Sequence, residues 1–254
     1  MLATEGTPRA FAERVMALLE RVEYRRVGPG AELDVILRLR YDAFFREGTI
    51  AYNRSERLPD DFDAGDHVYN FGIFIDGELA SALRIHRLLP FAMEQKSPAL
   101  ETFGDILAPQ IKAGRSILDP NRFVANYELA RKYPELRFIT LRPVYMAAEL
   151  FGADLITMTV RTEHQAFYRR SMYAYPVTPP RAYPMLKKPI SLLLINFNRD
   201  AARIIQRHPY ARSRDGERRA LFGDPVPYLA IRSDDFTPKQ AAAARIAGFA
   251  ARRV

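Results

Sequence analysis

The sequence predicts an α/β (α+β) fold in which helices flank one central mixed sheet. Two amphipathic helices come first, a β-hairpin pattern follows at 68–89, and a helix–strand–helix–strand order occupies 134–197. A hairpin pairs its strands antiparallel, whereas strands separated by a helix need a crossover, so one sheet of mixed direction accounts for both. A chain of 254 residues is long enough for one large domain with its own core.

The first two elements are predicted to be helices. Thr7-Pro8 is typical of a helix start, and apolar residues recur at helical spacing from Phe11 to Val22. Glycine and proline at 28–30 break the chain, and a second amphipathic pattern predicts a helix at about 31–46. The polar residues that follow, up to Gly65, predict a loop.

A hairpin is predicted next, because two runs of aromatic and branched residues flank Asp76-Gly77, a dipeptide typical of tight turns. Residues 88–112 contain three prolines and are predicted to form a loop with helical turns. A short strand is expected at 115–119, where Pro120 interrupts it.

The second half of the chain alternates helices with strands. The pattern predicts, in order, a helix within 134–150 that stops at Gly152, a strand at 153–160, a short helix at 163–172, a strand at 190–197 and a helical, basic remainder from 198. Pro143 marks either the first turn of the first of these helices or a kink in it. An alanine-rich helix is expected last.

Composition excludes several classes of protein. The chain has no cysteine, which excludes disulfides and thiolate chemistry, and its four histidines show no metal-ligand spacing, so no metal site is expected. No apolar run is long enough to span a bilayer, and residues 1–8 lack the pattern of a secretory signal, so the protein is expected to be cytoplasmic. The glycine motifs of P-loop NTPases, α/β-hydrolases and Rossmann dehydrogenases are absent.

The charge is basic and unevenly placed. The net charge is +8, and seven arginines lie between Arg199 and Arg219. Such a segment is either a solvated surface or a site for an anionic partner, such as lipid headgroups or an acidic protein. A nucleic-acid partner is unlikely by this pattern, because no DNA- or RNA-binding motif accompanies the charge.

Charged residues interrupt the apolar patterns in two places. Arg40 lies in the middle of the apolar stripe of its helix, so it should meet a buried carboxylate or an anionic ligand, unless its head reaches water at the helix end. Asp60, Asp61, Asp63 and Asp66 crowd together before the hairpin. They form either a solvated loop or a cluster that arginines or a substrate ammonium neutralise.

Three further positions are ambiguous when taken singly. Arg84 lies on the strand face opposite Leu83, where it points either to water or into a site. Asp119 precedes a proline at a strand end, which is typical of turn-capping and of catalytic acids alike. His164 and Tyr168 lie four residues apart on a helix and either share a cleft or belong to an ordinary polar surface.

Read in order, these residues resemble the acyl-homoserine-lactone synthase and N-acyl amino acid synthase superfamily, which is GNAT-like in fold. The matching segments are an Arg-x-x-x-Phe helix (Arg40 and Phe44), a D-x-F-D element (Asp60 to Asp63, with Asp61-Phe62 inside), a hairpin arginine (Arg84) and an acid-x-x-R-F signature (Asp119, Arg122 and Phe123). The resemblance implies a GNAT-like acyltransferase core at 24–197. It leaves an N-terminal helix at 1–23 and a helical basic C-terminal extension at 198–254.

Departures from the family pattern indicate which branch the chain resembles more. The chain has no tryptophan after the Arg-x-x-x-Phe helix, carries Asp119 where the family usually has Glu, and is longer than homoserine-lactone synthases. These points favour the N-acyl amino acid synthase branch, which moves a fatty acyl group from a carrier thioester to the α-amine of an amino acid. The alternatives are a homoserine-lactone synthase, or a non-catalytic carrier- or membrane-docking module on the same scaffold.

The expected acyl donor follows from a missing loop. The usual GNAT pyrophosphate loop needs glycines, and residues 126–134 contain none, so acyl-phosphopantetheine on an acyl carrier protein is expected rather than acyl-CoA, with no bound cofactor. Carrier proteins are acidic, and Arg131, Lys132 and Arg137 lie near the expected docking region. The basic C-terminal segment is a candidate for peripheral contact with the inner membrane face.

The resemblance also implies roles for the matched residues. Asp119 would accept the proton of the attacking amine. Arg40, Arg84 or Arg122 would bind the substrate carboxylate, and Asp60 and Asp63 would hold the ammonium or brace these arginines, with Asp119 paired in the same site. Phe44 and Phe123 are candidates for the acyl-chain pocket; Phe71 and Phe74 fit plain core packing better.

Overall fold

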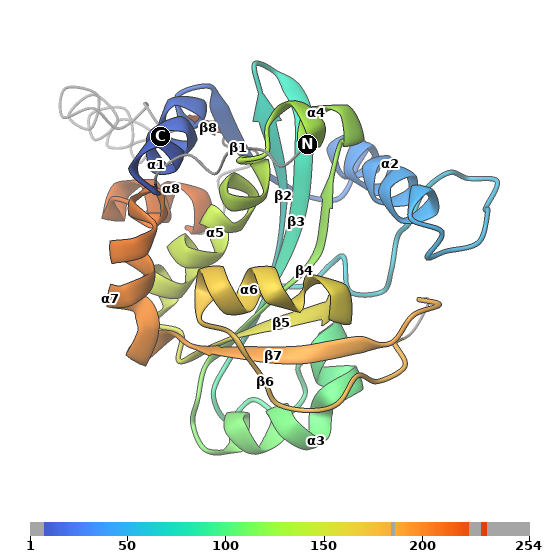
Figure 1. The fold of residues 1–254 in the computed structure, drawn as a ribbon. Helices are drawn as coiled ribbons and strands as arrows, with labels where there is room; N and C mark the ends of the chain where they lie inside the picture. The colour runs from blue at the N-terminus through green and yellow to red at the C-terminus, as the bar shows by residue number, and fades with distance from the viewer. Residues whose placement is uncertain (1–7, 184–185, 224–229, 233–254) are drawn as a thin grey trace, which may run out of the picture.

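The computed structural model describes residues 8–183, 186–223 and 230–232, and its strands form one sheet flanked by helices (Figure 1). The strand order is β6-β7-β5-β4-β3-β2-β1-β8. The strands are β1 (Val22–Val27), β2 (Val68–Ile75), β3 (Glu78–Leu88), β4 (Ile117–Ala125), β5 (Leu155–Arg161), β6 (Tyr175–Pro176), β7 (Ile190–Asn196) and β8 (Ala230–Arg232). The helices are α1 (Pro8–Leu19), α2 (Ala31–Arg46), α3 (Pro98–Lys112), α4 (Tyr127–Lys132), α5 (Leu136–Phe151), α6 (Gln165–Met172), α7 (Phe197–Arg207) and α8 (Asp215–Phe222), with 3-10 turns η1 (Thr162–His164) and η2 (Pro209–Ala211).

The predicted hairpin is confirmed. β2 and β3 pair antiparallel up to Ile75 and Glu78, which leaves a two-residue turn. Asp76 and Gly77 both have positive φ, 51° and 86°, as a type I′ turn requires. This turn matches the twist of the strands and sets which β3 side chains face each way.

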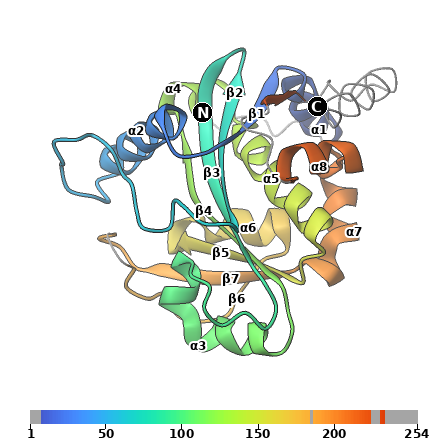
Figure 2. The ribbon, with the colours of Figure 1, turned by 180° about the vertical axis from the view of Figure 1, so that it is seen from behind.

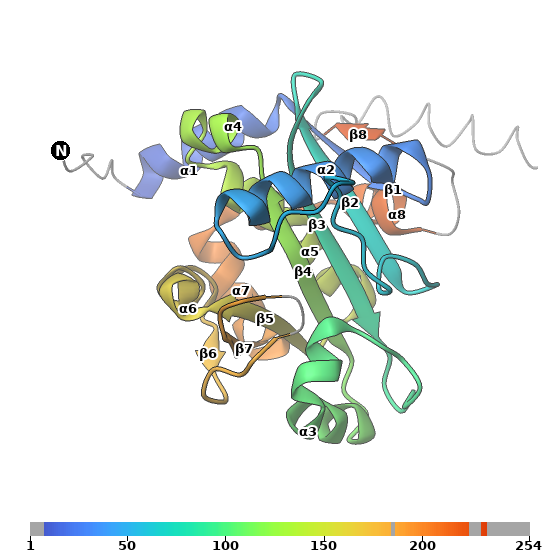
Figure 3. The same ribbon diagram turned by 90° about the vertical axis from the view of Figure 1, so that its right-hand side faces the viewer.

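The two faces of β3 have different neighbours. Leu83 and Ile85 lie in the main apolar core with α5, whereas Ala82 lies in a smaller cluster with Ile36 of α2. Helices α2 and α5 therefore cover opposite faces of the central strands, as Figure 3 shows, where α2 lies in front of β3 and β4 and α5 lies behind them. Arg84 shares the α2 face with Ala82, and it is fully buried there rather than directed to water.

Strands β4 and β5 diverge, which opens the sheet in its middle. They pair in parallel only at Ile117 with Leu155 and at Leu118 with Ile156. Both strands then continue, to Ala125 and Arg161 respectively. Figure 2 shows the divergence from behind, with α3 packed where the two strands are still together. Backbone groups on the facing edges of the separated stretches have no sheet partner across the gap, so this gap is where a ligand can bond to the backbone.

Several predicted boundaries are wrong. Val22 begins strand β1 instead of ending the first helix, and residues 98–112 form a 15-residue helix rather than a loop. β4 runs through Pro120 to Ala125. Proline has no N–H to donate, but β4 has already separated from β5 at this position, so no hydrogen bond between these two strands is lost. Pro143 lies inside α5, while Gly152 ends that helix in the left-handed conformation, as predicted.

The C-terminal segment belongs to the packed structure as far as it is described. A buried ion pair between Arg142 of α5 and Glu217 of α8, at 2.6 Å, joins it to the core. β8 pairs with β1, so a strand was missed in a segment predicted to be helical. The alanine-rich final helix lies outside the described residues, and the division of the chain at 23/24 and 197/198 stays a prediction. Within the described ranges, no helix has the length and apolar character needed to cross a bilayer.

Candidate active site

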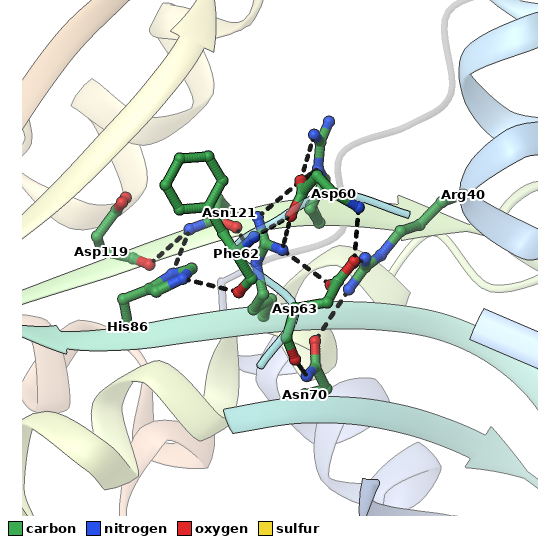
Figure 4. Close-up of polar contacts among 10 residues, drawn as sticks. Arg40, Asp60, Phe62, Asp63, Asn70, His86, Asp119 and Asn121 are labelled. Atoms are coloured by element: carbon green, nitrogen blue, oxygen red, sulfur yellow. Dashed lines mark hydrogen bonds and ion pairs between the residues drawn. The ribbon is translucent and has the colours of Figure 1, made fainter. Parts of the chain in front are cut away.

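Five charged side chains from separate parts of the chain meet in one buried ion-pair cluster (Figure 4). Arg40 of α2 lies 2.5 Å from Asp63, measured from Nη1 to Oδ1, and Arg84 of β3 lies 2.8 Å from the same carboxylate oxygen. Arg84 also binds Asp60 with both Nη atoms, and Arg122 of β4 donates its Nε to Asp60 at 2.9 Å. Arg40 and Arg84 have no exposed surface. The prediction that Arg40 is buried and paired is therefore confirmed.

The D-x-F-D element presents its two carboxylates through its own hydrogen bonds. Asp63 accepts from the backbone N–H of Asp60 at 2.9 Å, and Asp60 accepts from that of Phe62 at 3.0 Å. Asn70 accepts from Arg40 at 3.0 Å and donates to the Asp63 carbonyl at 2.9 Å, so β2 fixes the loop. The D-x-F-D segment therefore forms a turn in which the two aspartate side chains accept backbone hydrogen bonds of the same turn. Asp61, between them, is exposed.

The cluster carries a net positive charge. Arg40, Arg84 and Arg122 supply three positive charges, whereas Asp60 and Asp63 supply two negative ones. Burial lowers the pKa of Arg40 to about 10, although the charge of Asp63 opposes this. Burial acts to raise the pKa of Asp60, but the hydrogen bonds and charges of Arg84 and Arg122 outweigh it and hold that pKa below its ordinary value. One guanidinium charge is left for an anion from outside the chain.

A histidine and an asparagine, neither predicted as site residues, extend the network. The Asn121 side chain accepts from Arg84 Nε at 2.7 Å and donates to His86 Nδ1 at 3.0 Å and to the Asp119 carbonyl at 2.9 Å. Because His86 Nδ1 accepts, the proton lies on Nε2, which donates to the Phe62 carbonyl at 3.1 Å. His86 therefore anchors the acidic loop in its neutral form. The sequence feature that could have indicated His86 is its position two residues after Arg84, on the same face of the strand.

We expect the protein to lose stability as the pH falls from about 6.5 to about 4, with His86 as a main cause. Burial lowers the pKa of folded His86 to about 4, with the Asp119 charge opposing and Arg84 assisting, whereas the ordinary value is 6.5. Between these pH values the unfolded chain binds a proton at this histidine that the folded protein does not bind. The contribution of His86 to the free energy of unfolding is therefore complete above pH 6.5 and falls by about 3 kcal/mol as the pH approaches 4. His208, whose pKa burial also lowers, adds to the decline.

Urea unfolding at pH 7 and pH 4.5 measures this decline. The variant His86→Gln keeps a donor for the Phe62 carbonyl but does not titrate, so it should lose clearly less stability between the two pH values. Equal losses in both proteins would contradict the assignment.

Asp119 lies at the vertex of the gap between β4 and β5. It directly follows the last residue of β4 that pairs with β5, and its Oδ1 accepts from Thr157 Oγ1 across the gap at 2.8 Å. Its Oδ2 accepts from the backbone N–H of Ala99, in the first turn of α3, at 3.1 Å. The side chain is fully buried, and Figure 4 shows the carboxylate directed away from Asp60 and Asp63. The expected pairing of Asp119 with Arg40 and Arg84 is therefore wrong: its described partners are Thr157 and Ala99.

A β-bulge aims Arg122 at the cluster. Ala82 pairs with Val124 and Arg84 with Asn121, so the single residue Leu83 faces two residues of β4. Arg122 takes up the extra length with a φ of 52°, an uncommon conformation for a residue other than glycine. Its guanidinium then reaches Asp60 and lies 5.7 Å from the centre of the Phe44 ring. The local strain is held in place by these contacts.

A pocket of about 750 Å³ occupies the gap between β4 and β5. Its polar end includes Asn121 and Arg122, and its apolar walls are lined by Phe44, Phe123, Leu141, Met158, Phe167 and Tyr168. Pro120 and Met158 line it as well, whereas their chain neighbours Asp119 and Thr157 are buried behind its wall and are not among its lining residues. Within the described residues, no group of three or more His, Asp or Glu side chains is placed to hold a metal ion.

The remaining predicted residues fall into two groups. Phe44, Phe123, His164 and Tyr168 line the pocket, and the exposed Arg137 lies at its edge, with the exposed Arg131 and Lys132 on neighbouring α4. Phe71 belongs to the core, and Phe74 lies under Arg25, 3.9 Å from the guanidinium to the ring centre.

Tyr183 is a pocket residue that the sequence did not indicate. Burial and the nearby Asp119 charge raise the pKa of its phenol, so it stays protonated. No periodic pattern marks it in the chain, and only tertiary folding brings it to the pocket.

Comparisons with known proteins agree with this geometry. The structure of FeeM, an N-acyl amino acid synthase from uncultured soil microbes, is similar with a TM-score of 0.60 and 16% identity, covering 75% of this chain and 98% of FeeM. The AHL synthase LasI is similar with a TM-score of 0.51 and 16% identity (68% and 88% covered), and the CoA-dependent acyl-homoserine lactone synthase MesI with 0.51 and 19% (76% and 92% covered). At these identities the likeness concerns the fold, which is GNAT-like. No curated protein sequence matches.

The family is shown by the sequence itself. Residues 35–196 match the family model of the N-acyl amino acid synthase FeeM. This stretch covers more than half of the chain and contains most of α2, the ion-pair cluster, the bulge of β4 and both walls of the pocket. A docking module without catalytic activity is therefore not supported. The chain belongs to the FeeM family of N-acyl amino acid synthases and is an acyltransferase.

Proposed function

We propose that the protein transfers a long-chain fatty acyl group from the thioester of an acyl carrier protein to the α-amine of an amino acid. The observation that carries this proposal is the unmatched positive charge of the buried cluster, which faces the pocket through Arg122. An amino acid supplies the missing carboxylate, and a guanidinium binds a carboxylate with two parallel hydrogen bonds. A simple alkylamine would leave the charge unmatched.

The apolar part of the pocket suits the acyl chain. Leu141, Met158 and Phe167 form walls without charge at the inner end. In the gap between the strands, the amide groups of a phosphopantetheine arm could take the place of the missing strand and bond to the open edges of β4 and β5. The thioester would then lie close to the vertex where Asp119 is placed.

The start of α4 supports a carrier protein as the donor. Asn126 accepts from the backbone N–H groups of Glu128 and Leu129, at 3.0 and 3.1 Å. These N–H groups, which would otherwise be free to bind a pyrophosphate, already have a partner. The exposed Arg131, Lys132 and Arg137 near the pocket edge would contact the acidic carrier. Acyl-CoA is the donor to be tested against it, because MesI and BjaI, two similar structures, are CoA-dependent.

The proposed reaction needs one proton acceptor and one oxyanion site. The ammonium of the amino acid loses a proton to Asp119, whose carboxylate has lone pairs beyond the two bonds it makes. The neutral amine attacks the thioester carbon, and the oxyanion takes hydrogen bonds from backbone N–H groups at the open strand edges. As the intermediate collapses, the carbon–sulfur bond breaks, and the nitrogen gives up its second proton, which the departing phosphopantetheine thiolate takes up to leave as the thiol. Arg122 binds the carboxylate of the acceptor, and Asp60 holds the Arg122 guanidinium in position. Arg40, Arg84 and Asp63 brace this arrangement.

The proposal predicts that Arg122→Ala raises the KM for the amino acid about ten- to hundredfold, the loss expected for one charge-assisted contact. Steady-state assays with a long-chain acyl carrier, read by mass spectrometry of the product, measure this change. An acceptor that lacks the carboxylate should react slowly and equally with both proteins. Arg38→Ala, which removes an exposed arginine from the surface of α2, is the control.

Two outcomes would overturn parts of the proposal. A product that carries a lactone instead of a free carboxylate would make the protein a homoserine-lactone synthase. An unchanged KM in Arg122→Ala would remove the assigned carboxylate site.

Membrane contact through the basic C-terminal segment is a separate proposal, and sedimentation with anionic liposomes at two salt concentrations tests it.

A further inference from the structure

A second cleft lies across α6 from the acyl pocket, between α6, β6 and the start of α7 (Figure 1). Its volume is about 770 Å³, within the range of small-molecule sites. Arg169 and Arg170 of α6 and Arg199 and Arg203 of α7 line it, together with Tyr173 and Tyr175. It therefore gathers the first two arginines of the basic run at 199–219 with two arginines from another helix.

Two of the later arginines of that run have acidic partners of their own. Arg218 lies 2.6 Å from Glu149, and Arg219 lies 2.6 Å from Asp215. These contacts neutralise the charges within the chain.

The cleft has an excess of three positive charges. Its one acidic side chain, Asp200, is fully buried and takes three hydrogen bonds from Arg199, with the shortest at 2.7 Å. Arg203 is farther from it, at 3.6 Å. Arg170 bonds only to the Ala166 carbonyl, through Nε, and Arg169 has no hydrogen bond or ion pair within the described part of the chain. One carboxylate therefore neutralises one of four guanidinium groups.

Two of these guanidinium groups lie over tyrosine rings. Arg203 lies 4.2 Å from the centre of the Tyr173 ring, and Arg199 lies 5.8 Å from that of Tyr175. A guanidinium attracted to a ring face can still donate its N–H groups to an acceptor, as those of Arg203 could. The rings thus reduce the side-chain freedom that an anion would otherwise have to remove on binding.

We propose that this cleft binds a small anion that carries two phosphate groups. Three unmatched guanidinium charges call for more negative charge than one carboxylate supplies, and the fork of N–H donors on each guanidinium fits phosphate oxygens. The volume of this open cleft is sufficient for a small molecule. The site is separate from the acyl pocket, although both share α6: Phe167 and Tyr168 line the acyl pocket, whereas Arg169 and Arg170 line this cleft.

Calorimetry of the full chain with inorganic pyrophosphate tests the proposal. We expect one site per chain, and we expect Arg169→Ala with Arg203→Ala to weaken its affinity at least tenfold. Both side chains are exposed, so the fold should be retained, whereas Arg199 is left in place because Asp200 depends on it. Arg38→Ala with Arg54→Ala removes the same charge from another surface and should leave the affinity unchanged.

The possible results separate the sources of the phosphate. Pyrophosphate binding that is lost only in the cleft variant supports a free phosphate compound. Binding to vesicles of an anionic phospholipid, also lost only in that variant, supports the same chemistry in a lipid headgroup. Equal weakening in both double variants would reduce the effect to net charge and overturn the site. Loss of acyl-carrier binding in the cleft variant, with no pyrophosphate binding by the unaltered protein, would overturn it as well and assign the cleft to a protein partner.

Discussion

Replacing Asp60 with alanine is expected to lower the free energy of unfolding by about 3–5 kcal/mol, the usual loss when one partner of a buried ion pair is removed. Asp60 is the partner of both Arg84 and Arg122, and Arg84 has no exposed surface. Without Asp60 the cluster would hold three guanidinium groups against one carboxylate. The low pKa of Asp60 expresses the same coupling, because its charged form is the one that the arginines stabilise.

Asp61→Ala provides the matched control for this prediction. Asp61 is the next residue of the same loop and is exposed, so its replacement should change stability by less than about 0.5 kcal/mol. Urea unfolding at pH 7 compares the two variants with the unaltered protein. Similar small losses in both would mean that the cluster is hydrated and that its charges are not coupled as the short contacts indicate.

Residues that violate a local pattern were the best guides to the site from sequence. A charge on an apolar stripe, as at Arg40, has few low-energy solutions, so its burial and pairing could be inferred without a partner in view. The Asp76-Gly77 turn is similar, since its dihedral angles are nearly dictated by the two residues. Chain order then sufficed to group Arg40, Asp60, Asp63 and Arg84, because they match one family pattern.

What could not be inferred depends on tertiary contacts. His86 and Asn121 are ordinary strand residues until β3 and β4 pair, and only then does one amide connect Arg84 with the imidazole. The bulge at Arg122 comes from a register shift between strands, which no local pattern encodes. For Asp119 the family resemblance suggested an ion pair. The segment that contains α3 was predicted as a loop with helical turns, and it is the first turn of α3 that supplies one partner of Asp119.

Replacing Asp119 with asparagine is expected to lower kcat by about a hundred- to ten-thousandfold, the range for loss of a general base. Asparagine is the informative replacement because alanine would leave Ala99 N–H and Thr157 without partners in a fully buried place. An amide can still accept from Ala99 and can donate to the Thr157 hydroxyl, which is able to accept. The fold should therefore be retained, and Tm should change little.

Thr157→Val separates a base from a structural link between β4 and β5. This variant removes the other half of the same hydrogen bond but leaves the Asp119 carboxylate in place. If Asp119 accepts the proton, Thr157→Val should keep most of its kcat while Asp119→Asn loses nearly all of it, at similar stability. If the bond only ties the strands together, Thr157→Val should lose activity and stability, whereas Asp119→Asn, which keeps a hydrogen bond to Thr157, should keep both. The second pattern would leave Asp119 as the clamp at the vertex of the gap and would require another proton acceptor in the pocket.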